Sequence, residues 1–169
     1  MASTPLGRVH SALLIGALAS AAIGVPAAQA APLTRAEMTS RVTLLKEMNA
    51  TRVSHGLRPL RMSRVLNRPA VRHSQFLART GLLQHDAANG NPFYVRLYGA
   101  GYSRRKAVGE NLGMIGGCSL DASKVMIRMW LDSPSHRRNL LDPSYRYVGL
   151  AVVQASNCDQ TVYTTDFGG

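Results

Sequence analysis

The chain has only five histidines, and one of them lies in the stretch WLDSPSHRRNLLDP, residues 130–143. A histidine can act as an acid, a base or a metal ligand near neutral pH. Pro134 is expected to end the preceding helix, because proline removes a backbone donor and clashes with the previous turn. The turn that follows can hold His136 over a sheet. His136 is therefore a candidate functional residue, and Arg137 and Asn139 are expected to hydrogen-bond carbonyl groups of the same loop.

Two other histidines are explained by ordinary structure. His73 lies with Ala70 and Leu77 on the expected buried face of a helix, which predicts a hydrogen-bonded core histidine. His55 precedes Gly56 at the expected end of another helix, where a positive charge is favourable. Neither residue is predicted to be a ligand.

A serine hydrolase can be assembled from Ser133 or Ser135 with His136 and Glu110, but the sequence argues against it. No Gly-x-Ser-x-Gly motif is present. The adjacent side chains of Ser135 and His136 do not naturally face each other, as a nucleophile and its base must.

The first thirty residues have the composition of a signal peptide. Arg8 stands in a segment without acids, residues 11–25 are apolar or small, and Ala28-Gln29-Ala30 fits a cleavage site. The apolar stretch is shorter than the roughly 18 residues of a membrane-spanning helix. We therefore expect residues 1–30, including His10, to be removed, and residues 31–169 to form one secreted domain.

Two cysteines, Cys118 and Cys158, remain in a chain that we expect to be exported. In an oxidising compartment one disulfide is the economical interpretation. Closing a loop of about 40 residues would stabilise the fold by roughly 4 kcal/mol in the chain-entropy model. The alternative is a pair of buried free thiols.

The chain is strongly basic, with 20 Lys and Arg against 9 Asp and Glu and a formal net charge of +11. Such a field favours anionic partners, such as a lipid surface or an anionic polymer outside the cell. Solvated arginines that only confer solubility are the alternative. One Trp, six Tyr and three Phe are too few for a stacking surface. No sequence-specific binding of nucleic acid is expected.

Apolar periodicity and capping residues predict a first and a third long helix. The first begins at a capping box formed by Thr34 and Glu37. The third begins near Asp121 and ends before Pro134, and a short helix is expected within residues 91–99. The expected apolar faces are Met38, Val42, Leu45 and Met48 in the first helix, and Ala122, Val125, Met126, Met129 and Trp130 in the third.

The second predicted helix ends at Thr80, where Gly81 suits the C-terminal turn. Pro69 is unfavourable inside a helix, so the chain is expected either to start afresh with Asn67 as a cap or to kink. The expected solvent face is polar and mostly basic: Arg68, Arg72, Gln75 and Arg79.

Strand composition follows Pro143. Residues 145–154 and 161–167 predict a hairpin with a turn at residues 156–159, and residues 108–115 can add another strand. Helices first and strands last indicate an α+β domain with helices stacked on an antiparallel sheet.

Seven local motifs occur in a recognisable order: MNATRVSHGLRPL (48–60), AVRHSQFLA (70–78), His85 followed by GNPFYVRLYGAGY (90–102), VGENLG (108–113), WLDSPSHRRNLL (130–141), YVGLAV (147–152) and TTDFG (164–168). This series resembles the bacterial CAP, or SCP, domain superfamily, which includes the cysteine-rich secretory proteins and plant pathogenesis-related proteins. The resemblance implies a three-layer α-β-α sandwich with a central antiparallel sheet.

The resemblance also implies a cleft with a tetrad of two histidines and two acids. His85, Glu110 and His136 match three of its members. The fourth acid falls at Ser133, so the tetrad looks incomplete unless the helix end turns Asp132 inward. The matched motif residues Asn111, Trp130, Arg137 and Asn139 are expected to be structural.

Two imidazoles and a carboxylate can form an open zinc site, with His85, His136 and Glu110 as ligands or Glu110 as a catalytic base. The alternative is a hydrogen-bonded cluster that braces the cleft. The first interpretation predicts a hydrolase that uses Zn²⁺ or another divalent cation. The second predicts a secreted, non-catalytic module that binds a lipid or polymer of the cell envelope, which is the function we expect.

Overall fold

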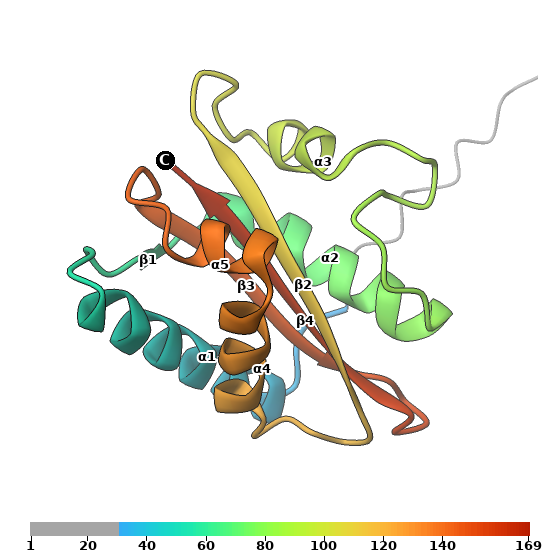
Figure 1. Cartoon of the computed structure of the whole chain (residues 1–169). Helices are drawn as coiled ribbons and strands as arrows, with labels where there is room; N and C mark the ends of the chain where they lie inside the picture. The colour runs from blue at the N-terminus through green and yellow to red at the C-terminus, as the bar shows by residue number, and fades with distance from the viewer. Residues whose placement is uncertain (1–30) are drawn as a thin grey trace, which may run out of the picture.

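The computed structural model describes residues 31–169. The predicted signal peptide and His10 lie outside the described residues. The described chain forms a three-layer α-β-α sandwich around a four-stranded sheet, as the resemblance implied (Figure 1). None of the described helices is both long and apolar enough to cross a membrane.

The sheet has the order β1-β3-β4-β2. The predicted hairpin is present as β3 (Tyr147–Gln154) and β4 (Gln160–Gly168), and the further strand as β2 (Val108–Gly116). These three strands are antiparallel. A two-residue strand that was not predicted, β1 (Arg61–Met62), pairs in parallel with β3. β2 is thus the edge strand opposite β1, so helices of both layers can contact it.

Helices cover both faces of the sheet. Their bounds are α1 (Arg35–Ser54), α2 (Arg64–Thr80), α3 (Phe93–Gly99), α4 (Ser123–Asp132) and α5 (Pro134–Leu140). On one face Leu150 packs in a core cluster with Leu44 of α1 and Trp130 of α4. On the other face Ala151, the next residue of β3, packs with Ala70 of α2. This alternation is expected for a strand buried on both sides.

The apolar face predicted for α1 is half right, because Met48 is fully buried and Leu45 packs against the core. Met38 and Val42 are 45% and 61% exposed, and the buried positions are Glu37, Ser40, Leu44, Met48 and Arg52. The buried polar residues have partners: the Glu37 carboxylate accepts from Gln154 N at 3.1 Å. Ser40 donates to the carbonyl of Leu120. Polar side chains can therefore be buried on a helix face when they have hydrogen-bond partners, and apolar periodicity alone does not identify such a face.

The stripe predicted for α4 is likewise only half right. Val125 and Met129 are 50% and 47% exposed, while Met126 and Trp130 are buried. Ile127 completes the buried face. Trp130 Nε1 donates to Leu112 O at 2.8 Å, which fixes α4 against β2.

A single helix, α2, runs through Pro69 without a fresh start. Ser63 caps its N-terminus, and Asn67 is not a cap, because its Oδ1 accepts from Leu150 N at 3.0 Å. Gly81 has φ +72° and ends the helix in the left-handed region, as predicted. A Cβ on Gly149 of β3 would collide with the backbone of Leu66, so glycine here allows α2 to lie close to the sheet.

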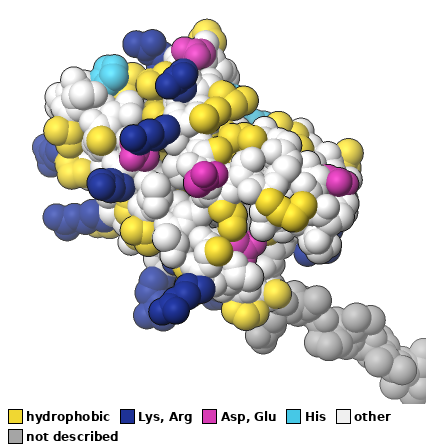
Figure 2. Space-filling view, turned by 90° about the horizontal axis from the view of Figure 1, so that it is seen from below, with side chains coloured by type: hydrophobic (Ala, Val, Ile, Leu, Met, Phe, Trp, Pro, Cys, Tyr) yellow, Lys and Arg dark blue, Asp and Glu magenta, His cyan; other side chains and the backbone are white. Residues whose placement is uncertain are grey.

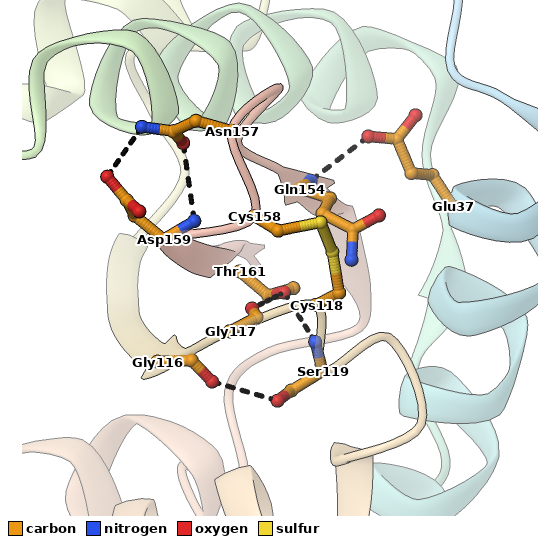
Figure 3. Close-up of a disulfide and its surroundings, with 10 residues drawn as sticks. All are labelled: Glu37, Gly116, Gly117, Cys118, Ser119, Gln154, Asn157, Cys158, Asp159 and Thr161. Atoms are coloured by element: carbon orange, nitrogen blue, oxygen red, sulfur yellow. Dashed lines mark hydrogen bonds between the residues drawn. A yellow bond between two sulfur atoms is a disulfide. The ribbon is translucent and has the colours of Figure 1, made fainter.

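The predicted disulfide between Cys118 and Cys158 is present, with Cα atoms 5.0 Å apart. It joins the segment after β2 to the turn between β3 and β4 (Figure 3). Next to it, Thr161 Oγ1 donates to Gly117 O and accepts from Ser119 N, both at 2.9 Å. The bond and these contacts hold the two connections together at one end of the sheet.

Candidate functional site

Two buried acids on neighbouring strands form the centre of the candidate site. Glu110 of β2 and Asp166 of β4 are register partners and are 3% and 0% exposed. Leu112, two residues after Glu110, packs with Leu77 of α2. Strand alternation therefore places Glu110 on the sheet face that α2 and α3 cover.

Arg96 of α3 lies between these acids. Its Nη2 atom contacts Oε2 of Glu110 and lies 3.9 Å from Oδ1 of Asp166. Its Nη1 atom donates to the carbonyl oxygen of His85 at 2.7 Å. One guanidinium thus faces two buried carboxyl groups and fixes the backbone of the segment before α3.

Burial raises the pKa of Asp166 to about 7, although Arg96 and His85 both act to lower it. Neither carboxyl oxygen accepts a hydrogen bond from another described residue. Arg96 lies closer to Glu110 than to Asp166, so its charge offsets the burial of Asp166 only in part. Asp166 is accordingly the acid that holds a proton below neutral pH.

The His85 ring is the accessible part of the cluster. Its Nδ1 atom lies 2.8 Å from Oε1 of Glu110, and its side chain is 50% exposed. Partial burial and the nearby Arg96 lower the pKa of His85. The ring also lies beside Phe93 of α3, with centroids 6.4 Å apart. Glu110 therefore has one carboxylate oxygen toward His85 and the other toward Arg96.

His136 lies in a helix rather than in the predicted turn. Pro134 ends α4 but also starts α5, since proline fits the first position of a helix. Asn111 Nδ2 donates to the carbonyl oxygen of His136 at 2.9 Å. Burial, and then the charge of His85, lower the pKa of His136.

The expected role of Asn139 within its own loop is wrong. Its Nδ2 atom donates to Glu110 O and to Asn111 Oδ1, both at 3.0 Å, so the side chain joins α5 to β2. Asn111 is fully buried and has a structural position, as expected. Arg137 is exposed to solvent.

His85 and Glu110 are in contact through their side chains, whereas His136 is bound to β2 through its backbone carbonyl group. Among residues 31–169, none of the hydrogen bonds at this site involves a His136 ring nitrogen. Asp132 is exposed, so it does not turn inward to complete a tetrad. Ser133 lies near Ser135, with hydroxyl oxygens 3.4 Å apart. The second acid of the cluster is Asp166.

Sequence reasoning missed both Arg96 and Asp166, although each lies in a motif that it singled out. Asp166 could have been noticed as the single acid in the segment TTDFG, which has the composition of a buried strand. A buried acid needs a cationic or hydrogen-bonding partner. Arg96 is the partner, and no local spacing links it to Asp166.

A divalent metal does not fit the residues as they are arranged. Within the described chain, no group of three or more His, Cys, Asp or Glu side chains is arranged to hold a metal ion. The guanidinium of Arg96 also contacts one oxygen of Glu110. A cation bound by Glu110 would be repelled by this fixed positive charge.

The two histidines that were predicted to be structural occupy the predicted places. His73 is 4% exposed, and its Nε2 lies 2.9 Å from Gln84 O. Burial lowers its pKa to about 4, so this histidine is neutral at physiological pH. His55 is the C-terminal cap residue of α1, and its Nδ1 lies 2.8 Å from Thr51 O.

Comparisons with known proteins agree on the fold. The sequence profile of the cysteine-rich secretory protein family, abbreviated CAP, matches residues 45–167. The uncharacterised protein YkwD of Bacillus subtilis is 27% identical over 123 residues, which are 72% of this chain and 44% of that protein. The chain therefore spans less than half the length of this curated relative.

Two solved structures have a similar fold. An extracellular protein of Bacillus anthracis that contains an SCP domain has a TM-score of 0.66 and 23% identity, over 81% of this chain and 44% of that one. An outer surface protein of Borrelia burgdorferi has a TM-score of 0.64 and 18% identity, over 77% of this chain and 92% of that one.

Proposed function

The chain belongs to the cysteine-rich secretory protein (CAP) family, and from this premise we propose that it is a non-catalytic binding module that acts outside the cell. Its ligand is a component of the cell envelope. The extracellular and outer-surface relatives support this location, as does the signal-peptide composition of residues 1–30. The high positive charge supports an anionic ligand.

The observation that carries the proposal is the environment of the Glu110 carboxylate. One oxygen faces His85 and the other contacts Arg96, and the side chain is fully buried. A general base must reach the proton of a substrate or a bound water. Glu110 has neither access nor a free oxygen, so its contacts brace β2, α3 and the His85 segment.

The alternative is a divalent-metal-dependent hydrolase in which His85 and His136 bind the metal and Glu110 is a ligand or base. It requires Arg96 to leave Glu110 so that the metal can take its place. Arg96 would then lose its nearest acid while its own side chain is mostly buried, and breaking a buried ion pair costs several kcal/mol. The resting geometry therefore supports the binding module.

Calorimetric titration of the purified protein with zinc tests this choice, with a His136→Ala variant beside it. We expect no stoichiometric binding to either protein. Stoichiometric binding to the wild type that is lost in His136→Ala would overturn the non-catalytic proposal and favour the hydrolase.

The binding role is tested by sedimentation of the purified protein with envelope fragments from the organism that produces it. We expect it to sediment with the fragments in the presence of a chelator. Failure to sediment with any envelope fraction would contradict the proposed function.

A further inference from the structure

Two hollows lie along α2, on the helix face that carries the predicted basic stripe. The first has a volume of about 450 Å³ and lies between α1 and α2, lined in part by Arg41, Arg68 and Arg72. The second, about 550 Å³, is lined in part by Arg72 and Arg79. Both volumes are in the range of ligand sites.

The two hollows adjoin each other, because Ala31, Pro32 and Arg72 line both of them. We call this combined surface the arginine groove and define it by Arg41, Arg68, Arg72 and Arg79. Leu33 and Val71 give the first hollow an apolar wall on which the stems of the arginines can lie.

The charges of the groove are unbalanced. The ion pairs found among residues 31–169 all belong to one group of side chains, the Glu110 cluster, which consists of His85, Arg96, Glu110 and Asp166. None of the four groove arginines is therefore paired with an acid. The one acid in the lining is Glu37. Its two carboxylate oxygens already accept hydrogen bonds from Thr34 and from Gln154 N. The positive charge of the groove is therefore available to a ligand.

The dimensions favour an extended ligand over a single ion. Arg68 and Arg79 are eleven residues apart on one helix, which corresponds to about 16 Å along its axis. A phosphate or carboxylate ion can contact guanidinium groups at only one point of this length. A flat membrane surface cannot follow a concave groove, whereas a flexible chain with repeated anionic groups can.

We propose that the arginine groove binds a linear polyanion in an extended conformation along α2. The inference rests on the proposed function and deepens it, because it names the chemical class of the envelope ligand. Arginine is suited to such a site, since its planar guanidinium can donate two parallel hydrogen bonds to one phosphate or carboxylate group.

Long-chain inorganic polyphosphate is a suitable probe, with orthophosphate and tripolyphosphate as shorter forms. Calorimetry should show affinity that rises with chain length. The double variant Arg68→Gln/Arg72→Gln should bind long-chain polyphosphate about tenfold more weakly or worse, because two charged contacts are lost. The slope of log K against log salt should fall by about 1.4.

A matched control is Lys124→Gln/Arg128→Gln, which removes the same charge from the exposed side of α4. It should change the affinity less than about twofold, since diffuse surface charge contributes little at moderate salt. Equal losses in both double variants would overturn the groove in favour of general electrostatic attraction. So would binding of anionic vesicles but not of polyphosphate.

The two proposals can fail separately. If the wild type sediments with envelope fragments but binds no polyanion, the groove inference is wrong and the binding module stands. If Arg68→Gln/Arg72→Gln keeps wild-type affinity for polyphosphate, the groove inference is also wrong. If nothing is bound in either experiment, both proposals are wrong.

Discussion

Arg96 decides the chemistry of the Glu110 cluster because it is the cation between two buried acids. Arg96 is in contact with the Glu110 carboxylate and lies farther from Asp166. Ionising Asp166 would place a second negative charge in the protein interior, and Arg96 compensates for only part of that unfavourable free energy. The cluster is therefore better described as a pH-sensitive brace than as a metal site. Its accessible feature is the His85 ring, which is half exposed.

The raised pKa of Asp166 predicts a specific pH dependence of stability. The folded carboxyl titrates at about 7 and the unfolded one near its ordinary value of 3.8. Between these pH values the folded state holds more protons, so stability falls as the pH rises through the window. Asp166→Asn removes this loss. It should match the wild type at pH 4 and be more stable by roughly 2–4 kcal/mol at pH 8.

Urea unfolding of both proteins across this pH range measures the difference directly. The lowered pKa values of His73 and His136 give the opposite slope in both proteins, so their contribution cancels in the comparison. Burial lowers the pKa of His85 and the charge of Asp166 acts to raise it, so its contribution differs between the two proteins. Asp132→Asn, an exposed control, should give a difference that does not vary with pH. A constant difference for Asp166→Asn as well would contradict the buried, protonated carboxyl.

The sequence identified the polar cluster only in part, for a physical reason that these residues make clear. His85 and Glu110 could be found because they stand in motifs with a known order. Arg96 and Asp166 belong to the cluster only because the fold brings them together beside Glu110, and they are 70 residues apart in the sequence. Periodicity reports which residues are buried, but it does not report which distant charge accompanies them.

At the scale of the elements, Arg52 ties α1 to the segment that follows α5. It is fully buried in the last turn of α1. Its guanidinium donates to Arg58 O at 3.0 Å, to Leu140 O at 2.8 Å and to Asp142 O at 3.1 Å. One guanidinium group therefore binds all three carbonyl groups, and the position of α5, which contains His136, depends on Arg52.

Arg52→Met, which keeps the length but not the donors, should lower the free energy of unfolding by roughly 3 kcal/mol, because several carbonyl groups lose their partner. Arg52→Lys should recover only part of this loss, since an ammonium group lacks the planar fork of donors. Urea unfolding is the measurement. The exposed control Arg128→Met should stay within about 0.5 kcal/mol of the wild type, and equal stability of Arg52→Met would refute the role of Arg52.

The disulfide acts at the same scale, on the connections at one end of the sheet. Its cysteines are 40 residues apart, so the Cys118→Ser/Cys158→Ser variant should lose up to about 4 kcal/mol of stability. Thermal unfolding should show the loss. Treating the wild type with a reductant should reproduce it, while the double variant should not respond to the reductant.

Element types were predictable where burial follows a simple period, and so was the buried face of α2, with Ala70, His73 and Leu77. The faces of α1 and α4 were predicted only in part. The hairpin was found because β-branched and aromatic residues run together in its strands, and β2 because a short apolar segment stands at residues 108–115. The buried face of α1 includes Glu37, Ser40 and Arg52, whose partners lie on β3 and in loops far along the chain. A face that depends on such partners cannot be read from one helix alone.

At the scale of the whole molecule, most of the positively charged side chains in the described part of the chain have no acidic partner. Figure 2 shows Lys and Arg side chains mainly on the left part and the lower edge of the face it presents, with Asp and Glu scattered singly. The acids of the Glu110 cluster are buried and compensate only Arg96. The surface therefore keeps most of the net charge of +11, in keeping with an anionic partner.

Cleavage of the predicted signal peptide would change the charge of the arginine groove. The first described residue, Ala31, lines both hollows of the arginine groove, and its carbonyl accepts from Gln75 Nε2 at 2.7 Å. We propose that residues 1–30 are cleaved after Ala30. Cleavage would create an α-ammonium group at Ala31, beside the four arginines, and so add a positive charge to the groove.

Intact-mass spectrometry of the exported protein should give the mass of residues 31–169 with one disulfide, and its N-terminal peptide should begin Ala-Pro-Leu-Thr. Ala30→Tyr should block processing, because the cleavage site needs a small residue there, whereas Gln29→Leu at the neighbouring position should not. A retained leader or a different first residue in the wild type would contradict the cleavage. It would also remove the added charge from the edge of the groove, while the four arginines themselves would remain.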